Sequence, residues 1–333
     1  MAQIEVVLAI RDYNGNEYEE LKKLFEGSVF PYTLCGNPLT FTPVLNSKER
    51  IINRKNETDL KFNDIQVKLI AEIPAEIDIE NNYIHYYNGS RDLSAEDITV
   101  KKLHKYFKHD TLDDQFEGEL EVFCQKMTQA VFLAKPDASL ETAQCTIYLD
   151  HVRFREKRFI DNLVQEEVYE EYSNLFKTDL NIGKTWEWLV RNGVTATGEA
   201  SCPVVPILSY IFNREYHEVL FYSVIGLEAL YGNGKNNRGI KYTLQNRIHA
   251  VFSDITTDQI GNLYAARSEF AHGNGEIGSC NLVSYLIHHR EKYRDKAILS
   301  CAILFESIRL LIANNAARFT FQESLDVQVG FDQ

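Results

Sequence analysis

The sequence predicts an α+β protein in which a strand-rich N-terminal domain is followed by an all-helical C-terminal bundle. In the first part of the chain apolar residues alternate with polar ones, which is typical of strands with one buried face. After about residue 155 apolar residues recur at three- and four-residue spacing, which is typical of helices that bury one face. We therefore expect two domains, over 1–155 and 156–333.

Strands are expected where β-branched, aromatic and other apolar residues follow the period-two pattern. These segments are 4–8, 39–42, 65–73 and 145–154. Glycine and asparagine turn sequences lie at 14–16, 35–38 and 88–90, so the first 90 residues are expected to be strands and turns. Residues 94–134 are expected to be helical.

Helices are expected through most of the second half. The segments are 156–176, a long helix from 202–206 to about 231, 239–253, 256–272 and 281–316. The helix ending near 231 carries an apolar stripe of Leu220, Val224, Leu227 and Tyr231. Thr256 and Gln259 have the spacing of a capping box, which marks the start of the next helix. Short connections favour an antiparallel bundle.

Composition narrows the class of protein. At 333 residues and 44% hydrophobic content, the chain is long enough to bury two cores. It contains no apolar stretch long enough to span a membrane, and its first residues lack the basic and apolar regions of a signal peptide, so none is expected. We therefore expect a soluble protein of the cytoplasm that makes no membrane contact. The six cysteines form no C-x-x-C pair, so the sequence gives no support for a zinc knuckle or a redox dithiol.

The negative charge is concentrated in the first domain. Residues 201–333 contain 12 Lys and Arg against 13 Asp and Glu, a net charge of −1, so residues 1–200 carry −12 of the total −13. Non-specific nucleic-acid binding depends on neutralising phosphates, so such a chain should not bind nucleic acid indiscriminately. A nucleic-acid contact should be local, and the second half is the more favourable place for it.

The candidate active site is Arg267-Ser268-Glu269-Phe270-Ala271-His272, at the end of the expected 256–272 helix. Five helical steps of 100° place Arg267 and His272 about 140° apart on an ideal helix. The two side chains can act together if His272 lies in the frayed last turn, a position that Gly273 immediately after it favours.

Three sequence blocks in this half resemble the Apea-like HEPN family in order and spacing. They are FYSVIGLEALY at 221–231, LQNRI at 244–248 and LYAARSEFAHG at 263–273. The resemblance covers about residues 205–316. Ser268 departs from the family pattern, which often has Asn, Asp or His after the arginine.

The resemblance implies a HEPN helical bundle and a metal-independent endoribonuclease that needs no cofactor. It implies a homodimer with a composite active site, in which the RNA 2′-hydroxyl is the nucleophile. His272 would then move protons and Arg267 would hold the scissile phosphate. HEPN proteins of this kind resemble toxins and anti-phage defence effectors that cleave tRNA or other single-stranded RNA. The N-terminal domain would then sense a trigger, and an antitoxin protein is a further possible partner.

Supporting roles are open for several other residues. Ser268 and Glu269 lie inside the motif, and Glu228 could pair with Arg267 or orient His272. Structural roles compete with these: Glu228 is a candidate for a buried ion-pair partner, and Arg247 for a structural partner. The polar loop around 232–239 could contact RNA through Lys235, Arg238 and Lys241, although a flexible loop after a helix explains it equally.

A second class of function fits the same residues. The helical domain could be a non-catalytic HEPN module that dimerises and binds a nucleotide or a partner protein. In that case the arginine would only form an ion pair with an acidic residue, and the histidine would only cap the helix. Loss of activity in Arg267→Ala and His272→Ala, with folding retained, distinguishes the nuclease from this alternative.

Overall fold

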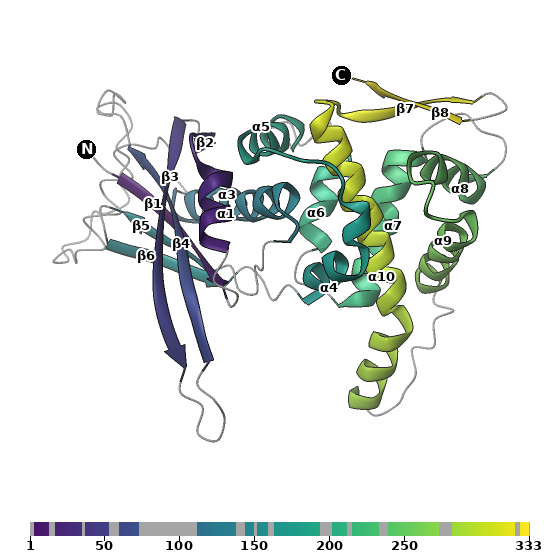
Figure 1. Cartoon of the computed structure of the whole chain (residues 1–333), viewed down its shortest axis with the longest axis horizontal. Helices are drawn as coiled ribbons and strands as arrows, with labels where there is room; N and C mark the ends of the chain where they lie inside the picture. The colour runs from purple at the N-terminus through teal and green to yellow at the C-terminus, as the bar shows by residue number, and fades with distance from the viewer. Residues whose placement is uncertain are drawn as a thin grey trace. The chain divides into compact units, whose positions relative to one another are not determined.

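The computed structural model has a mixed α+β fold, with strands gathered in the N-terminal part and helices in the C-terminal part (Figure 1). It describes residues 3–12, 17–34, 37–52, 60–72, 112–137, 144–149, 152–158, 163–193, 202–211, 215–232, 239–272, 282–323 and 327–332. The expected turns at 14–16 and 88–90, residues 35 and 36 of the turn at 35–38 and the expected helical residues 94–111 lie outside this description.

The chain forms two compact units. The N-terminal unit comprises Met1–Phe132, Ala138–Asp161 and Asn181–Glu187. The C-terminal unit comprises Leu133–Asp137, Asn162–Leu180 and Trp188–Gln333. The chain therefore passes between the units several times, whereas one boundary near residue 155 was expected. Packing partners, rather than order along the chain, define these units.

The N-terminal unit is built on a six-stranded antiparallel sheet with the order β2-β3-β4-β1-β5-β6. Its strands are β1 (Gln3–Asp12), β2 (Phe30–Leu34), β3 (Asn37–Ile52), β4 (Leu60–Glu72), β5 (Gln144–Leu149) and β6 (Val152–Arg158). On β4 the alternating residues Ile65, Val67, Leu69 and Ala71 are all buried, which confirms the expected strand.

Two helices accompany the sheet, α1 (Glu17–Phe25) and α3 (Leu112–Ala134). Strands and turns were expected throughout the first 90 residues, and α1 shows that this was wrong for 17–25. Leu21 and Phe25, four residues apart, are buried on one side of α1, which is helical spacing. On α3, Phe123 packs against Phe41 at 4.3 Å and Trp186 at 5.1 Å between ring centres.

The single strand expected at 145–154 is two paired strands, β5 and β6. Residues 156–158 belong to β6, so the helix expected to start at 156 starts at Leu163 instead. This helix, α4 (Leu163–Tyr172), is followed directly by a short 3-10 turn, η1 (Ser173–Leu175). β6 is an edge strand with five charged residues among seven. Charged edges are common in sheets, and they hide the apolar alternation on which strand prediction depends.

The C-terminal unit is mostly helical. Its helices are α6 (Val205–Ile211), α7 (Tyr216–Tyr231), α8 (Ile240–Val251), α9 (Thr257–Ala271) and α10 (Leu282–Ala313). A further helix, α5 (Ile182–Asn192), was not expected from the sequence, and its last residues belong to this unit. One long helix to residue 231 was expected, but the capping box of Glu215 and Glu218 starts α7 separately from α6. No described helix of the chain is long and apolar enough to cross a bilayer.

The central contact of this unit is between α7 and α10, which run side by side (Figure 1). The expected stripe on α7 is buried, with Leu220, Val224, Leu227 and Tyr231 each at most 2% exposed. A Cβ added at Gly226 would lie 2.9 Å from both terminal methyl groups of Leu304 on α10. Gly226 therefore allows the two helices to approach closely.

The C-terminal unit is not all helical, contrary to expectation. After α10 the chain forms an antiparallel hairpin of β7 (Arg318–Glu323) and β8 (Val327–Asp332). Phe319 stacks on Tyr231 at 5.2 Å, and the guanidinium of Arg247 lies 4.7 Å from the ring centre of Phe321. Arg247 also donates to the carbonyl of Tyr231 at 2.8 Å, so its predicted structural role is confirmed.

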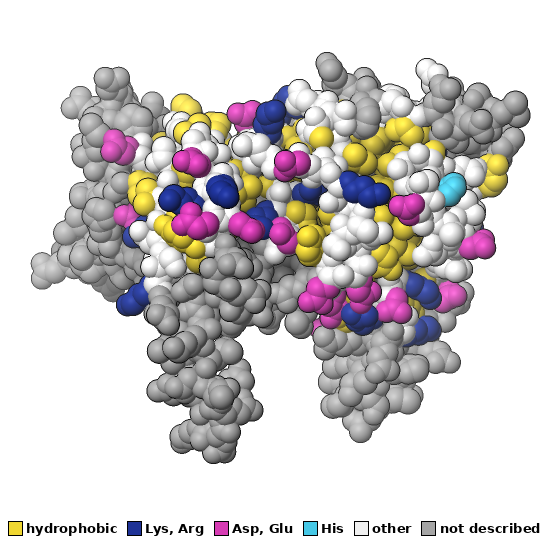
Figure 2. Space-filling model, viewed as in Figure 1, with side chains coloured by type: hydrophobic (Ala, Val, Ile, Leu, Met, Phe, Trp, Pro, Cys, Tyr) yellow, Lys and Arg dark blue, Asp and Glu magenta, His cyan; other side chains and the backbone are white. Residues whose placement is uncertain are grey.

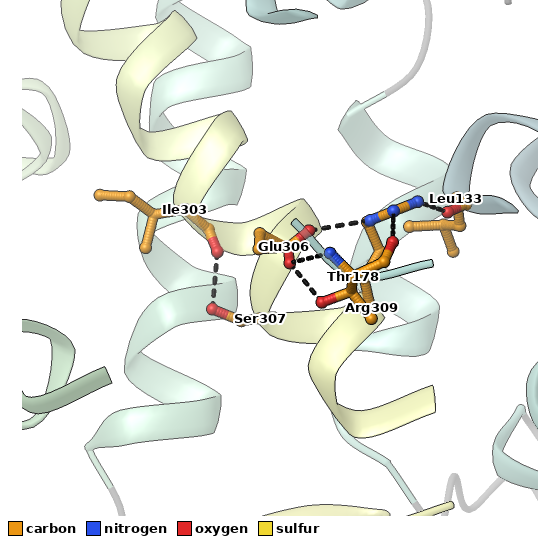
Figure 3. A network of polar contacts seen from close by, with 6 residues as sticks. All are labelled: Leu133, Thr178, Ile303, Glu306, Ser307 and Arg309. Carbon is orange, nitrogen blue, oxygen red and sulfur yellow. Dashed lines mark hydrogen bonds and ion pairs between the residues drawn. The ribbon is translucent and has the colours of Figure 1, made fainter. Parts of the chain in front are cut away.

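A buried ion pair joins α10 to neighbouring main chain (Figure 3). Arg309 Nε donates to Glu306 Oε2 at 2.8 Å, and the two terminal nitrogens of Arg309 donate to the carbonyls of Leu133 and Thr178. The other oxygen of Glu306 accepts from the amide and hydroxyl of Thr178. Each charged group therefore has hydrogen-bond partners in the interior, where an unpaired charge is costly.

Candidate functional site

Helix α9 carries the Arg267–His272 motif, and its start is fixed by the expected capping box. The Thr256 hydroxyl accepts from the amide of Gln259 at 3.2 Å, and the Gln259 side chain accepts from the amide of Thr256 at 2.9 Å. Ile260, Leu263 and Ala266 are buried at 2% exposure each. The buried face fixes the rotation of α9 about its axis, and so fixes the direction in which the motif side chains point.

Arg267 reaches toward α7. Its Nη2 lies 3.4 Å from Glu228 Oε2, and its guanidinium lies 5.6 Å from the ring centre of Phe221. The two charged side chains are partly buried, at 22% and 17% exposure. The pair predicted between Glu228 and Arg267 is therefore present. No contact of Glu228 with His272, the other role considered, is found among the described contacts.

The pair is incompletely satisfied. Arg267 Nε and Glu228 Oε1 are both buried, and neither has a hydrogen-bond partner within the described part of the chain. Burial raises the pKa of the Glu228 carboxyl, and the nearby charge of Arg267 opposes that rise only in part. A guanidinium with unused donors beside a poorly solvated carboxylate is able to exchange partners at modest cost.

His272 lies at the C-terminal cap of α9. Its backbone N–H donates to the carbonyl of Ser268 at 3.0 Å, so the residue closes the last turn, and its side chain is exposed. Five residues correspond to about 7.5 Å of rise, so Arg267 and His272 lie within two turns of each other. Ser268 is half-buried and Glu269 is exposed, while Gly273 lies outside the described residues.

The basic residues proposed to contact RNA are only partly described. Lys235 and Arg238 lie outside the described residues. Lys241 is exposed on the first turn of α8, and its Cε would lie 3.1 Å from a Cβ added at Gly261. Gly261 precedes His272 by 11 residues, or about 16 Å along α9, so Lys241 lies well away from His272.

Aromatic side chains near Arg267 were missed as site residues by the sequence analysis. Phe270, two residues before His272, has its ring centre 5.6 Å from that of Phe221 and 5.5 Å from that of His217. Phe221 lies 5.5 Å from Tyr222, which stacks on Tyr210 at 5.2 Å. The run of aromatic residues at 216–222 was visible in the sequence. Their contact with Phe270 was not, because it depends on how the helices pack.

The charges on the described surface are mixed. On the face shown in Figure 2, basic and acidic side chains are interspersed, without a broad area of basic side chains alone. Within the described ranges, no group of three or more His, Cys, Asp or Glu side chains could hold a metal ion. No family model, curated protein or solved structure matches the chain.

Proposed function

We propose that the C-terminal unit is a HEPN-type bundle and that the protein is an endoribonuclease in which Arg267 and His272 carry the reaction. One observation supports this above the others: both side chains reach the surface near the end of the same helix, and Arg267 has donors that its carboxylate partner leaves unused. A site sealed in the interior would have excluded an RNA backbone.

The reaction is a transesterification followed by product release. The 2′-oxygen of one nucleotide attacks the adjacent phosphorus, a 2′-O–P bond forms, and the bond from phosphorus to the 5′-oxygen breaks. The products are a 2′,3′-cyclic phosphate and a 5′-hydroxyl, and no metal or cofactor takes part in these steps. Arg267 stabilises charge that develops on the phosphate oxygens.

Two protons must be moved, one from the 2′-hydroxyl and one to the leaving 5′-oxygen. A single imidazole cannot do both at once. A homodimer that brings two copies of His272 to one groove supplies both a base and an acid. It also brings two guanidinium groups together, which raises the local positive potential on a chain whose net charge is −13.

The Glu228 carboxylate acts as a resting counter-ion in this proposal. It holds Arg267 in place until a phosphate competes for the guanidinium. Because the contact is a single one of 3.4 Å, the exchange breaks one weak hydrogen bond, and a phosphate can offer an acceptor to Nε, which has no partner among the described residues.

The biological role follows from the resemblance to HEPN toxins and defence effectors. We propose that the enzyme cleaves tRNA or other single-stranded RNA in the cytoplasm, and that the N-terminal unit responds to a trigger or to a neutralising protein. Activity would then be restrained until the cell is attacked, because unrestrained RNA cleavage stops translation.

Expression of the intact chain in a bacterial host tests the function. Wild type should arrest growth and degrade cellular RNA, whereas Arg267→Ala and His272→Ala should do neither. Asn262→Ala, on an exposed position of the same helix, should behave as wild type. Equal behaviour of wild type and both site variants would favour the alternative, a non-catalytic module in which Arg267 and Glu228 form a structural pair.

A further inference from the structure

Aromatic rings form a continuous band that starts at the Arg267 guanidinium. The aromatic band comprises Tyr210, His217, Phe221, Tyr222 and Phe270, from helices α6, α7 and α9. Neighbouring rings along it lie 5.2–5.6 Å apart, centre to centre. The guanidinium lies 5.6 Å from the Phe221 ring, so the band is continuous with the candidate active site.

The band is open to solvent to an extent that core aromatics are not. Tyr210 on α6 is 49% exposed and Phe270 on α9 is 39% exposed, whereas Tyr216 and Tyr231 on α7 are at most 3% exposed. His217, Phe221 and Tyr222 are half-buried. An aromatic side chain that stays exposed forgoes much of the stabilisation that burial would bring, and contiguous exposed apolar residues commonly mark binding surfaces.

We propose that the aromatic band is a stacking platform for unpaired RNA bases, in which Phe270 stacks on a base next to the phosphate bound by Arg267. This inference rests on the proposed ribonuclease function and defines its substrate further. Every base offers a flat π-face, so stacking on aromatic rings binds single strands with little sequence preference. In a duplex these faces are already covered by neighbouring bases.

The position of the band favours nucleotides over another occupant. Each base in a strand is joined to a phosphate, and here the Phe221 ring of the band lies 5.6 Å from a guanidinium whose Nε has no partner among the described residues. Phe270 is also two residues from His272, on the last turn of α9. The hydroxyl groups of Tyr210 and Tyr222 and the imidazole of His217 add polar groups that can bond to base edges. A second copy of the chain is the competing occupant.

The test uses an RNA that cannot be cleaved, so that binding is measured apart from catalysis. A single-stranded 2′-O-methyl oligonucleotide containing 2-aminopurine, whose fluorescence falls on stacking, is titrated with the full chain. Wild type and Phe270→Tyr should quench it. Phe270→Leu, which keeps the apolar bulk but removes the ring, should abolish quenching and weaken binding on the order of 5- to 150-fold.

Tyr242→Leu is the matched control, because Tyr242 is a 42% exposed aromatic residue on α8 outside the band. It should bind and quench as wild type. Unchanged quenching and affinity in Phe270→Leu would overturn the proposal, and so would loss of self-association in that variant without loss of RNA binding. Quenching that depends on Phe270, together with no cleavage of the matching ribo-oligonucleotide, would support base stacking while refuting the nuclease.

Discussion

The guanidinium of Arg267 lies 3.4 Å from the carboxylate of Glu228, 39 residues earlier in the chain. Each partner keeps a buried polar atom that has no hydrogen bond to any described residue. A structural ion pair is usually better satisfied, as the buried pair of Arg309 and Glu306 is in the same unit. The contrast supports different roles for the two pairs. One stabilises the fold, and the other holds an arginine that can change partners.

Replacement of the two motif residues should affect folding stability differently. Arg267→Ala leaves the poorly solvated carboxylate of Glu228 without its cation and should cost about 1–3 kcal/mol in the free energy of unfolding. His272→Ala removes an exposed side chain and should change it by less than about 0.5 kcal/mol. Urea unfolding followed by circular dichroism measures both. Equal destabilisation would mean that His272 has a structural role.

Glu228→Gln should change how stability depends on pH. Burial raises the pKa of Glu228 above its ordinary value of 4.5, so the folded state holds this proton more tightly than the unfolded state. Wild type therefore loses stability as pH rises from 4.5 through the raised value, a loss that the glutamine variant lacks. Thermal unfolding of both proteins across this pH range makes the comparison. A stability difference that stays constant with pH would contradict it.

Gly226→Ala should destabilise the C-terminal unit. The added methyl group would meet Leu304 at 2.9 Å, and such overpacking costs about 1–3 kcal/mol, more than the roughly 1 kcal/mol that alanine gains over glycine in a helix. Gly261→Ala on α9 is the control, since its nearest neighbour is the flexible end of Gln245. A neutral Gly226→Ala variant would show that α7 and α10 are packed less closely than described.

Arg309→Lys should be destabilising although it preserves the charge. Arg309 uses three nitrogens to reach Glu306, Leu133 and Thr178, and one lysine ammonium cannot match that geometry (Figure 3). We expect a loss of about 1–3 kcal/mol in urea unfolding. Arg294→Lys, at a surface cluster where the arginine is 35% exposed, should cost less than about 1 kcal/mol. Equal losses would argue against a special role for the buried network.

Periodic signals made much of the fold predictable. The alternation on β4, the stripe on α7 and the capping box at Thr256 each depend on residues close together in the sequence, and each has the expected structure. The short helix α1 and the β7–β8 hairpin were missed because neither is long enough to establish a strong period. The end of α7 and the start of α9 were placed within one residue by their flanking residues.

The candidate site was predictable only in part. Arg267 and His272 lie in one local motif, whose spacing can be recognised directly. The aromatic band instead depends on packing between α6, α7 and α9, which places Phe270 beside Phe221 across 49 residues of sequence. No local sequence pattern predicts which apolar residues of a helix stay exposed, because their exposure depends on which other elements pack against that helix.

The central claim is that His272 and Arg267 promote attack by an RNA 2′-hydroxyl. Its most direct measurement is cleavage of a single-stranded oligoribonucleotide with EDTA present, followed by analysis of the product ends. We expect a 2′,3′-cyclic phosphate and a 5′-hydroxyl, no cleavage where the attacking nucleotide is 2′-deoxy, and at least a roughly 100-fold slower reaction in His272→Ala. Cleavage of the deoxy substrate, 5′-phosphate products or an unimpaired His272→Ala enzyme would contradict the claim.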